Sequence, residues 1–325
     1  MRIFFCSAFF LLLFFGIATA IFGQDVVQET PSLFLLPFGY DFLRFEENAV
    51  HNPALGVGFL SGEQDIPFDK VDRRFFGLAL YRPLIFTTPP FEIPKYIHQI
   101  ETLFDGRIQR HQLLFIFKSS SDKPVYGGLH TFQGAAGWGY EIVRKPQMSL
   151  ILGGVIAVTD FGITLPSGAA WPVLPLPFIR FGIDTQWFAL SFDFLTGPNL
   201  EFTVAPKERI RFTADMRMDY YRSITDLIYE FTLWYRLFTP EHKLGDFAGI
   251  GLGVKNDSMD FTLANNMSFE LQQTSVFAVV DLSLVKIQGG WIFDSRYITN
   301  DQKNGSPGSG FFVSIQGIIP INLRQ

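Results

Sequence analysis

The sequence has little cysteine and little charge, and each scarcity excludes a class of protein. Cys6 is the single cysteine among 325 residues, so the chain can form neither a disulfide framework nor a cysteine-ligated zinc cluster. Charged residues make up 18% of the chain, and the formal net charge is −5. This balance provides no basic surface for nucleic acid, and we expect no nucleic-acid partner.

Long apolar runs are missing beyond the N-terminus. No segment after residue 20 holds the roughly 18 consecutive apolar residues that mark a transmembrane helix. Hydrophobic residues nevertheless make up 48% of the chain, and 38 positions are phenylalanine. The protein must therefore bury or expose a large apolar surface without helical membrane spans.

The N-terminus has the pattern of a secretory signal peptide. Arg2 supplies a positive charge, residues 3–16 form an apolar core, and Ala18-Thr19-Ala20 has the small side chains that signal peptidase requires. The core is shorter than the roughly 20 residues of a membrane-spanning helix. We predict that residues 1–20 are cleaved during Sec-type export, which would also remove Cys6.

Residues 208–237 give the clearest evidence for β-strands. Mainly apolar side chains occupy the even positions from 210 to 220 and, after a turn near Arg222-Ser223, the odd positions from 227 to 237. An alternation of two gathers the charged side chains on one face of a strand, whereas a helix would scatter them. The two charged faces hold Arg209, Arg211, Asp215, Arg217, Asp219, Asp226, Glu230 and Arg236.

The alternation recurs in other parts of the chain, and no domain linker interrupts it. Further alternating runs cover residues 188–194, 259–271 and 311–323. Turn-forming sequences lie at 145–146, 196–199, 206–207, 240–241 and 256–258. Longer breaks are expected at 87–109, with a short helix within 93–104, and at 162–175 and 298–309. This spacing predicts a single all-β domain.

Strand length favours a transmembrane barrel over a soluble sandwich or a lipocalin-like barrel. A strand of about 13 residues spans roughly 43 Å, or about 33 Å along the membrane normal at a tilt of about 40°. Strands of soluble proteins usually stop at about 5 or 6 residues. We predict a single antiparallel up-and-down β-barrel of about 12 strands, with 10 to 14 allowed. The charged faces must then line the lumen, because each lipid-facing arginine would cost up to about 2–4 kcal/mol.

The chain resembles the outer-membrane β-barrel proteins of bacteria in its signal peptide, its cysteine-free mature part and its amphipathic C-terminal strand, residues 311–323. This resemblance implies a location in the outer membrane of a diderm bacterium. It also implies the lipid bilayer and the outer-membrane assembly machinery as partners. Counting strands back from a periplasmic C-terminus places residues 298–309 and 239–245 outside the cell. The same count places residues 162–175 on the periplasmic side.

The predicted organisation has three parts: the signal peptide of residues 1–20, an N-terminal segment of residues 21–50, and the barrel of residues 51–325. The middle segment could be a periplasmic arm, a plug or a first strand. The glycines of residues 249–253 fall on one face of a strand, and we predict that they make room in the lumen for bulky neighbours. They lack the Gly-Lys-Ser/Thr of a phosphate-binding loop.

The sequence offers no catalytic or metal-binding pattern. Neither His111 nor His130 precedes a serine by two residues, as outer-membrane lipid hydrolases require, and no metal-ligand spacing occurs. We therefore predict no enzyme and no cofactor. The favoured function is a passive channel for small hydrophilic solutes with a mixed-charge lumen. A closed structural or surface-interaction barrel is the first alternative, and a lipid-modifying enzyme without the usual motif is the second.

Overall fold

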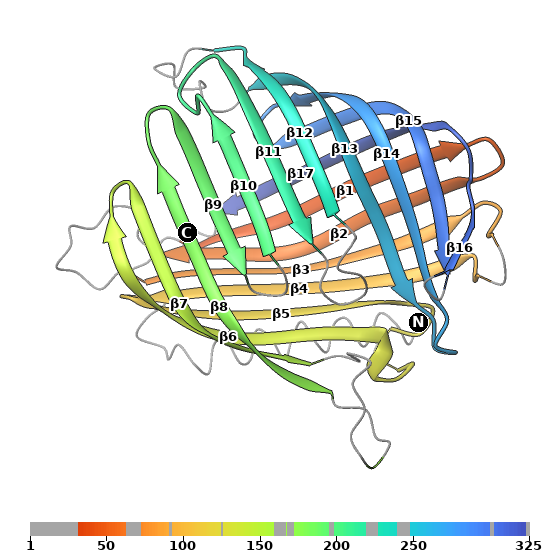
Figure 1. Ribbon diagram of the computed structural model, residues 1–325, viewed down its shortest axis with the longest axis horizontal. Helices are drawn as coiled ribbons and strands as arrows, with labels where there is room; N and C mark the ends of the chain where they lie inside the picture. Colours follow the sequence, from red (N-terminus) through yellow and green to blue (C-terminus); the bar gives the residue numbers. More distant parts are fainter. Residues whose placement is uncertain are drawn as a thin grey trace.

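The protein is a closed antiparallel β-barrel (Figure 1). The computed structural model describes residues 32–62, 73–90, 93–124, 126–158, 167, 172–194, 198–218, 227–238, 248–299 and 302–322. The predicted signal peptide therefore lies outside the described residues. The strands are β1 (Ser32–Phe45), β2 (Ala49–Gly62), β3 (Arg73–Phe86), β4 (Tyr96–Ile108), β5 (His111–Ser121), β6 (Phe132–Lys145), β7 (Met148–Val158), β8 (Val173–Asp184), β9 (Phe188–Phe194), β10 (Pro198–Val204), β11 (Ile210–Met218), β12 (Leu227–Arg236), β13 (Gly249–Thr262), β14 (Ser268–Asp281), β15 (Val285–Thr299), β16 (Gln302–Gly305) and β17 (Gly310–Asn322). A short 3-10 helix, η2 (Leu129–Thr131), precedes β6.

The first and last strands of the described chain close the barrel. β1 pairs with β17 from Leu33 opposite Asn322 to Phe45 opposite Gly310. Of the 17 described strands, β16 pairs only with β15, and β15 also pairs directly with β17. Leaving β16 out, 16 described strands form the wall. The predicted antiparallel up-and-down barrel is confirmed, and the predicted number of about 12 strands is wrong.

Three segments were misread, and two of them, 87–109 and 259–271, explain part of the low strand number. The expected break at 87–109 contains β4, which pairs along its whole length with β3. The expected turn at 256–258 lies inside β13. The alternating run of 259–271 is a hairpin rather than one strand, because the chain turns between Thr262 and Ser268. Leu263 and Met267 are four residues apart, which is an even number. The apolar residues therefore stay at odd positions on both sides of the turn.

The connections gather at two ends of the barrel. The end where β1 begins and β17 ends is called here the terminal end, and the opposite one the loop end. Strands β7 and β15 both end at the loop end, and β12 ends at the terminal end. The strand ends that flank 162–175 and 239–245 are therefore on the opposite sides, relative to 298–309, from those predicted. Residues 239–245 themselves lie outside the described residues.

Part of the N-terminal segment belongs to the wall. Residues 32–45 form β1, and β2 already begins at Ala49. The alternation that supports β1 is visible in its pairing. On the outside, Phe42 is opposite Val313 and its ring contacts that of Phe311, and on the inside Asp41 is opposite Ser314. Among the arm, the plug and the first strand, the described residues of this segment form the strand.

The wall turns a sharp corner at β6 and β7. Gly139 of β6 and Gly153 of β7 are opposite each other, and a Cβ on Gly153 would collide with the carbonyl oxygen of Trp138. A Cβ on Gly139 would lie 2.7 Å from the ring of Phe178 on β8. The two glycines therefore let the sheet fold tightly around that ring. The corner is filled by a buried cluster of Leu114, Ala135, Ile151, Val155, Ala157 and Phe178.

Candidate functional site in the barrel lumen

The outer face of the barrel is apolar on most strands. On β17, Phe311, Val313 and Ile315 are exposed, while Phe312 and Ser314 between them are buried. The most exposed large apolar side chains elsewhere on the wall include Leu55 at 67%, Leu252 at 67% and Ile156 at 56%. Exposed apolar surface on this scale is typical of a barrel whose outside lies against lipid.

Several aromatic residues of β6 and β15 differ in which side of the wall they occupy. Trp138 and Tyr140 are exposed on β6 and both contact the His111 ring, with centroids 5.8 and 5.2 Å apart. Trp291 is also exposed on the outside. Tyr297, farther along β15, is buried inside the barrel. A bulge between Thr274 and Ser275 shifts the pairing of β14 with β15 and so changes which residues of β15 face inward.

The pairing of β11 with β12 joins the two predicted charged faces. Asp215 is opposite Glu230, Arg217 is opposite Ile228, and Arg211 is opposite Trp234. Asp215, Arg217 and Glu230 line a cavity of about 390 Å³. These three residues are the part of the predicted set that the structure brings together around one space.

The other predicted residues have different surroundings. The Arg211 guanidinium lies over the Trp234 ring, 5.4 Å from its centroid, and the Arg236 guanidinium donates a hydrogen bond to the carbonyl oxygen of Pro206 at 2.5 Å. Arg209 belongs to the exposed turn between β10 and β11. Asp219 and Asp226 lie outside the described residues.

The opposite wall supplies the rest of the cavity, and sequence reasoning missed it. Strands β1 to β5, β13, β15 and β17 contribute charged and polar side chains to it. Part of the signal was present in the inward positions of β4, Gln99 and Glu101, but the predicted break at 87–109 hid it. The charged residues lining the cavity are five basic ones, Arg82, Lys118, Arg217, Lys255 and Lys286, and six acidic ones, Asp41, Glu101, Asp215, Glu230, Asp257 and Asp260.

Several of these charges neutralise one another. Lys118 pairs with Asp260 at 3.3 Å, Lys286 with Glu230 at 3.6 Å, and Lys255 with Asp257 at 3.7 Å. Gly251 and Gly253 of β13 face the same interior, where the rings of Trp234 and Phe277 pack over them. The structure thus places bulky side chains beside these glycines, as the sequence predicted.

Five cavity charges remain without such a partner, and one of them, Asp41, accepts a hydrogen bond from the Ser314 hydroxyl at 2.5 Å. Within the described residues, Arg82, Glu101, Asp215 and Arg217 make no side-chain hydrogen bond and no ion pair within 4.0 Å. Glu101, Asp215 and Arg217 are exposed to the lumen, and the Nε atom of Arg82 is buried without a hydrogen-bond partner. A buried guanidinium N–H without a partner is costly, so this position favours an acceptor from a solute or from water.

A second cluster of charges closes the lumen beside the corner. Arg180 of β8 pairs with Asp193 of β9 at 2.6 Å and with Asp105 of β4 at 3.1 Å. Strands β5, β6 and β7 stand between β4 and β8 in the sheet, so this guanidinium bridges across the interior. Glu141, which is 2% exposed, pairs with both Arg107 and Arg144 nearby. These contacts hold the corner folded.

Strands β13, β14 and β15 extend past the rim at the loop end and form what we call the flap, residues 257–273 and 294–299. The pairing of β12 with β13 ends at Asn256, and that of β17 with β15 ends at Ile292. The bulge at Thr274/Ser275 marks the place where the flap leaves the wall.

The flap crosses the mouth of the barrel. At its tip, the Ala264 N–H donates to Asp122 at 2.8 Å, and the Ser120 hydroxyl of β5 donates to the carbonyl oxygen of Asp260 at 3.0 Å. In the wall, β13 is separated from β5 in one direction by β14, β15, β17 and β1 to β4. In the other direction it is separated from β5 by β6 to β12. The two strands are therefore diametrically opposite. Figure 1 shows the blue β13–β14 hairpin reaching the helix beside β6.

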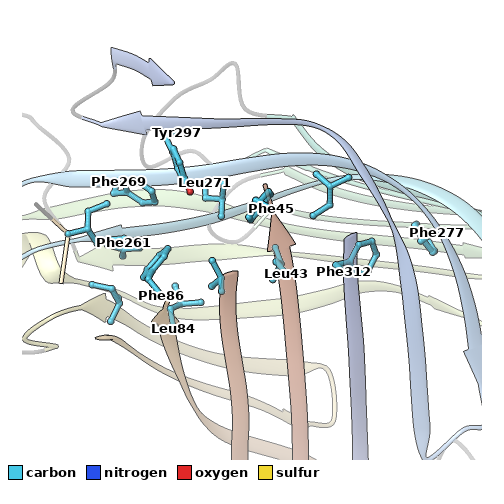
Figure 2. Packing of buried hydrophobic residues seen from close by; sticks show 14 of the residues in the cluster. Leu43, Phe45, Leu84, Phe86, Phe261, Phe269, Leu271, Phe277, Tyr297 and Phe312 are labelled. Carbon is cyan, nitrogen blue, oxygen red and sulfur yellow. The ribbon is translucent and has the colours of Figure 1, made fainter. Parts of the chain in front are cut away.

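The inner side of the flap is fixed by an apolar cluster (Figure 2). Phe261, Phe269 and Leu271 are at most 1% exposed and pack with rim residues of β1 to β4. The Phe86 ring of β3 lies 6.2 Å from that of Phe261 and 6.3 Å from that of Phe269, centroid to centroid. The Asn48 amide donates to the Tyr297 hydroxyl at 3.4 Å. The flap thus covers the side of the mouth next to β1–β4.

The described residues include neither a metal-binding cluster nor a membrane-spanning helix. No group of three or more His, Cys, Asp or Glu side chains in that part of the chain could hold a metal ion. No helix among those residues is long and apolar enough to cross a membrane.

Comparison with solved structures finds distant similarities. The chain is similar to the crystal structure of OpdQ from Pseudomonas aeruginosa, with 10% identity and a TM-score of 0.39 over 92% of this chain and 100% of that one. It is similar to OccK2 (OpdF) from the same organism in complex with glucuronate, with 8% identity and a TM-score of 0.40 over 91% and 99%. The P. aeruginosa outer membrane protein opdK gives 8% identity and a TM-score of 0.35 over 90% and 100%. No protein-family model and no curated protein matches the sequence.

Proposed function

We propose that this protein spans the outer membrane of a diderm bacterium and passes small hydrophilic solutes passively through a mixed-charge lumen. The observation that carries the proposal is the contrast between the two faces of a closed barrel. Large apolar side chains are exposed on the outside, and charged side chains surround a cavity of about 390 Å³ inside. Lipid covers such an outside, and water fills such an inside. The lipid bilayer and the outer-membrane assembly machinery are the partners that this location implies.

The size of the barrel supports an open path. Barrels of about 8 strands are filled by their own side chains, whereas those of about 16 to 18 strands leave an aqueous channel. The corner at β6–β7 and the flap occupy part of the interior of this 16-strand wall. The remaining space is the cavity between β1–β5 and β11–β17, and we propose that solutes pass there.

The test is planar-bilayer conductance of the refolded mature chain, after its heat-modifiable mobility has shown that it is folded. A channel predicts stepwise currents whose reversal potential depends on cavity charges. Arg217→Gln should shift selectivity toward cations and Asp215→Asn toward anions, because each removes one unpaired charge from the cavity wall. Arg209→Gln is the matched control, since Arg209 lies in an exposed turn outside the cavity.

A closed structural barrel is the second candidate, and the flap is the observation that favours it. A hairpin that reaches from β13 to β5 and is fixed by buried aromatic rings could block the mouth. This alternative predicts a folded, heat-modifiable barrel without current steps. It also predicts that charge variants of the cavity change stability instead of ion selectivity.

A further inference from the structure

We infer that the lumen favours zwitterionic solutes, those with one ammonium and one carboxylate group, over neutral solutes of the same size. This inference depends on the proposed channel function and names the class of solute that the channel favours. The observation is that, within the described residues, each of two facing walls of the cavity presents unpaired charges of both signs.

The first wall presents one unpaired cation and one unpaired anion side by side. Arg82 of β3 is opposite Gln99 of β4, and Leu80 is opposite Glu101. Arg82 and Glu101 are therefore diagonal neighbours on the same face, with Cβ atoms about 7–8 Å apart. Both line the cavity, yet they make no ion pair with each other. Each remains available to a group of opposite charge on a solute.

The second wall repeats the arrangement on β11. Asp215 and Arg217 are two residues apart and share one face of the strand, roughly 7 Å from each other along its axis. Both line the cavity and are exposed to it. β4 and β11 are on opposite sides of the barrel, because β5 to β10 separate them in one direction and β12 to β15, β17, β1, β2 and β3 in the other.

Most of the other cavity charges are paired. Lys118, Lys255 and Lys286 are each held by a carboxylate, and Asp41 accepts a hydrogen bond from the Ser314 hydroxyl at 2.5 Å. A purely anionic or purely cationic solute would meet unpaired charges of both signs. A zwitterion can satisfy an unpaired charge of each sign, and so replace the hydration that it loses on entering.

The contacts between a solute and these side chains are weak enough for the solute to leave the lumen after it has entered. Ion pairs between partly exposed groups are weak, because water screens them and the side chains lose freedom on pairing. A solute held in this way can leave again, which a conducting site requires. Neutral solutes can form hydrogen bonds with these groups but no ion pairs, so they are held less strongly.

The experiment is osmotic swelling of liposomes that contain the refolded mature chain, with alanine and lactamide compared at equal osmolarity. The two solutes have nearly the same size and no net charge, so no counter-ion follows either of them. The wild-type protein should admit alanine faster than lactamide by roughly threefold. The double variants Asp215→Asn/Arg217→Gln and Arg82→Gln/Glu101→Gln keep the net charge and should each bring that ratio closer to one.

The matched control is Glu208→Gln/Arg209→Gln, which removes the same pair of charges from the exposed turn after β10. Its ratio should equal that of the wild type. Equal swelling rates for both solutes in the wild type would overturn the zwitterion preference while leaving a channel in place. A ratio that survives both cavity variants would overturn the assignment to these four residues. If folded protein gives no swelling with either solute, the channel proposal itself fails and the inference fails with it.

Discussion

The flap allows a prediction about which force holds it across the mouth. Two kinds of contact fix it: the buried rings of Phe261 and Phe269, and the pair of Lys118 with Asp260. Phe269 is 0% exposed, and truncation of a buried phenylalanine typically costs about 3–5 kcal/mol. The ion pair has side chains 36% and 17% exposed, and a pair of this kind contributes about 0–1 kcal/mol. The apolar packing should therefore dominate.

Phe269→Ala should loosen the flap, and Asp260→Asn should leave it nearly unchanged. A loss of about 4 kcal/mol changes the equilibrium between closed and lifted flap by roughly a thousandfold. The expected signs are larger and noisier single-channel currents and faster proteolysis at the turn of residues 263–267. Phe293→Ala is the control, because Phe293 is 52% exposed on the outer face. A greater effect of Asp260→Asn than of Phe269→Ala on either readout would refute this reasoning.

Two further predictions concern the interior and the outer face. Glu141→Ala leaves the guanidinium groups of Arg107 and Arg144 without their buried carboxylate. The free energy of unfolding in urea should therefore fall by about 3–5 kcal/mol. An unfolding midpoint equal to that of the control variant Glu208→Ala would contradict a structural role for this cluster. Leu55→Arg places a charge in the middle of β2 at a side chain that is 67% exposed, and should destabilise the barrel in lipid by about 2–4 kcal/mol. Equal stability of the wild type and Leu55→Arg in vesicles would show that this face does not lie on lipid.

Local alternation was enough to predict the faces of the strands. On β11 and β12 the residues that the sequence grouped as one polar face are opposite each other, as Asp215 and Glu230 show. The C-terminal run of 311–323 forms β17, with its phenylalanine and isoleucine positions exposed as expected. These features depend only on the period of the strand, which is visible within a few residues.

The strand number depended on signals that proline obscured. β1, β2 and β3 contain Pro37, Pro53 and Pro83, and the pairing of β2 with its neighbours is interrupted near the first two. Proline weakens a strand pattern because it cannot donate a ladder hydrogen bond. The flap, the corner and the cavity wall formed by β1–β5, β13, β15 and β17 were missed for a different reason. Each depends on contacts between segments far apart in the chain, such as Lys118 with Asp260 and Asp105 with Arg180.

The closing of β1 on β17 has a consequence for how the molecule can assemble. Until Leu33 pairs near Asn322 and Phe45 near Gly310, the other strands form an open sheet with two rows of unpaired amides. Hydrocarbon cannot solvate such edges, so a partly zipped sheet cannot rest within a bilayer. The first and last strands of the described chain, which are far apart in the sequence, must therefore pair as the barrel enters the membrane. A defect in this seam should lower the yield of inserted protein and leave the conductance of the inserted molecules unchanged.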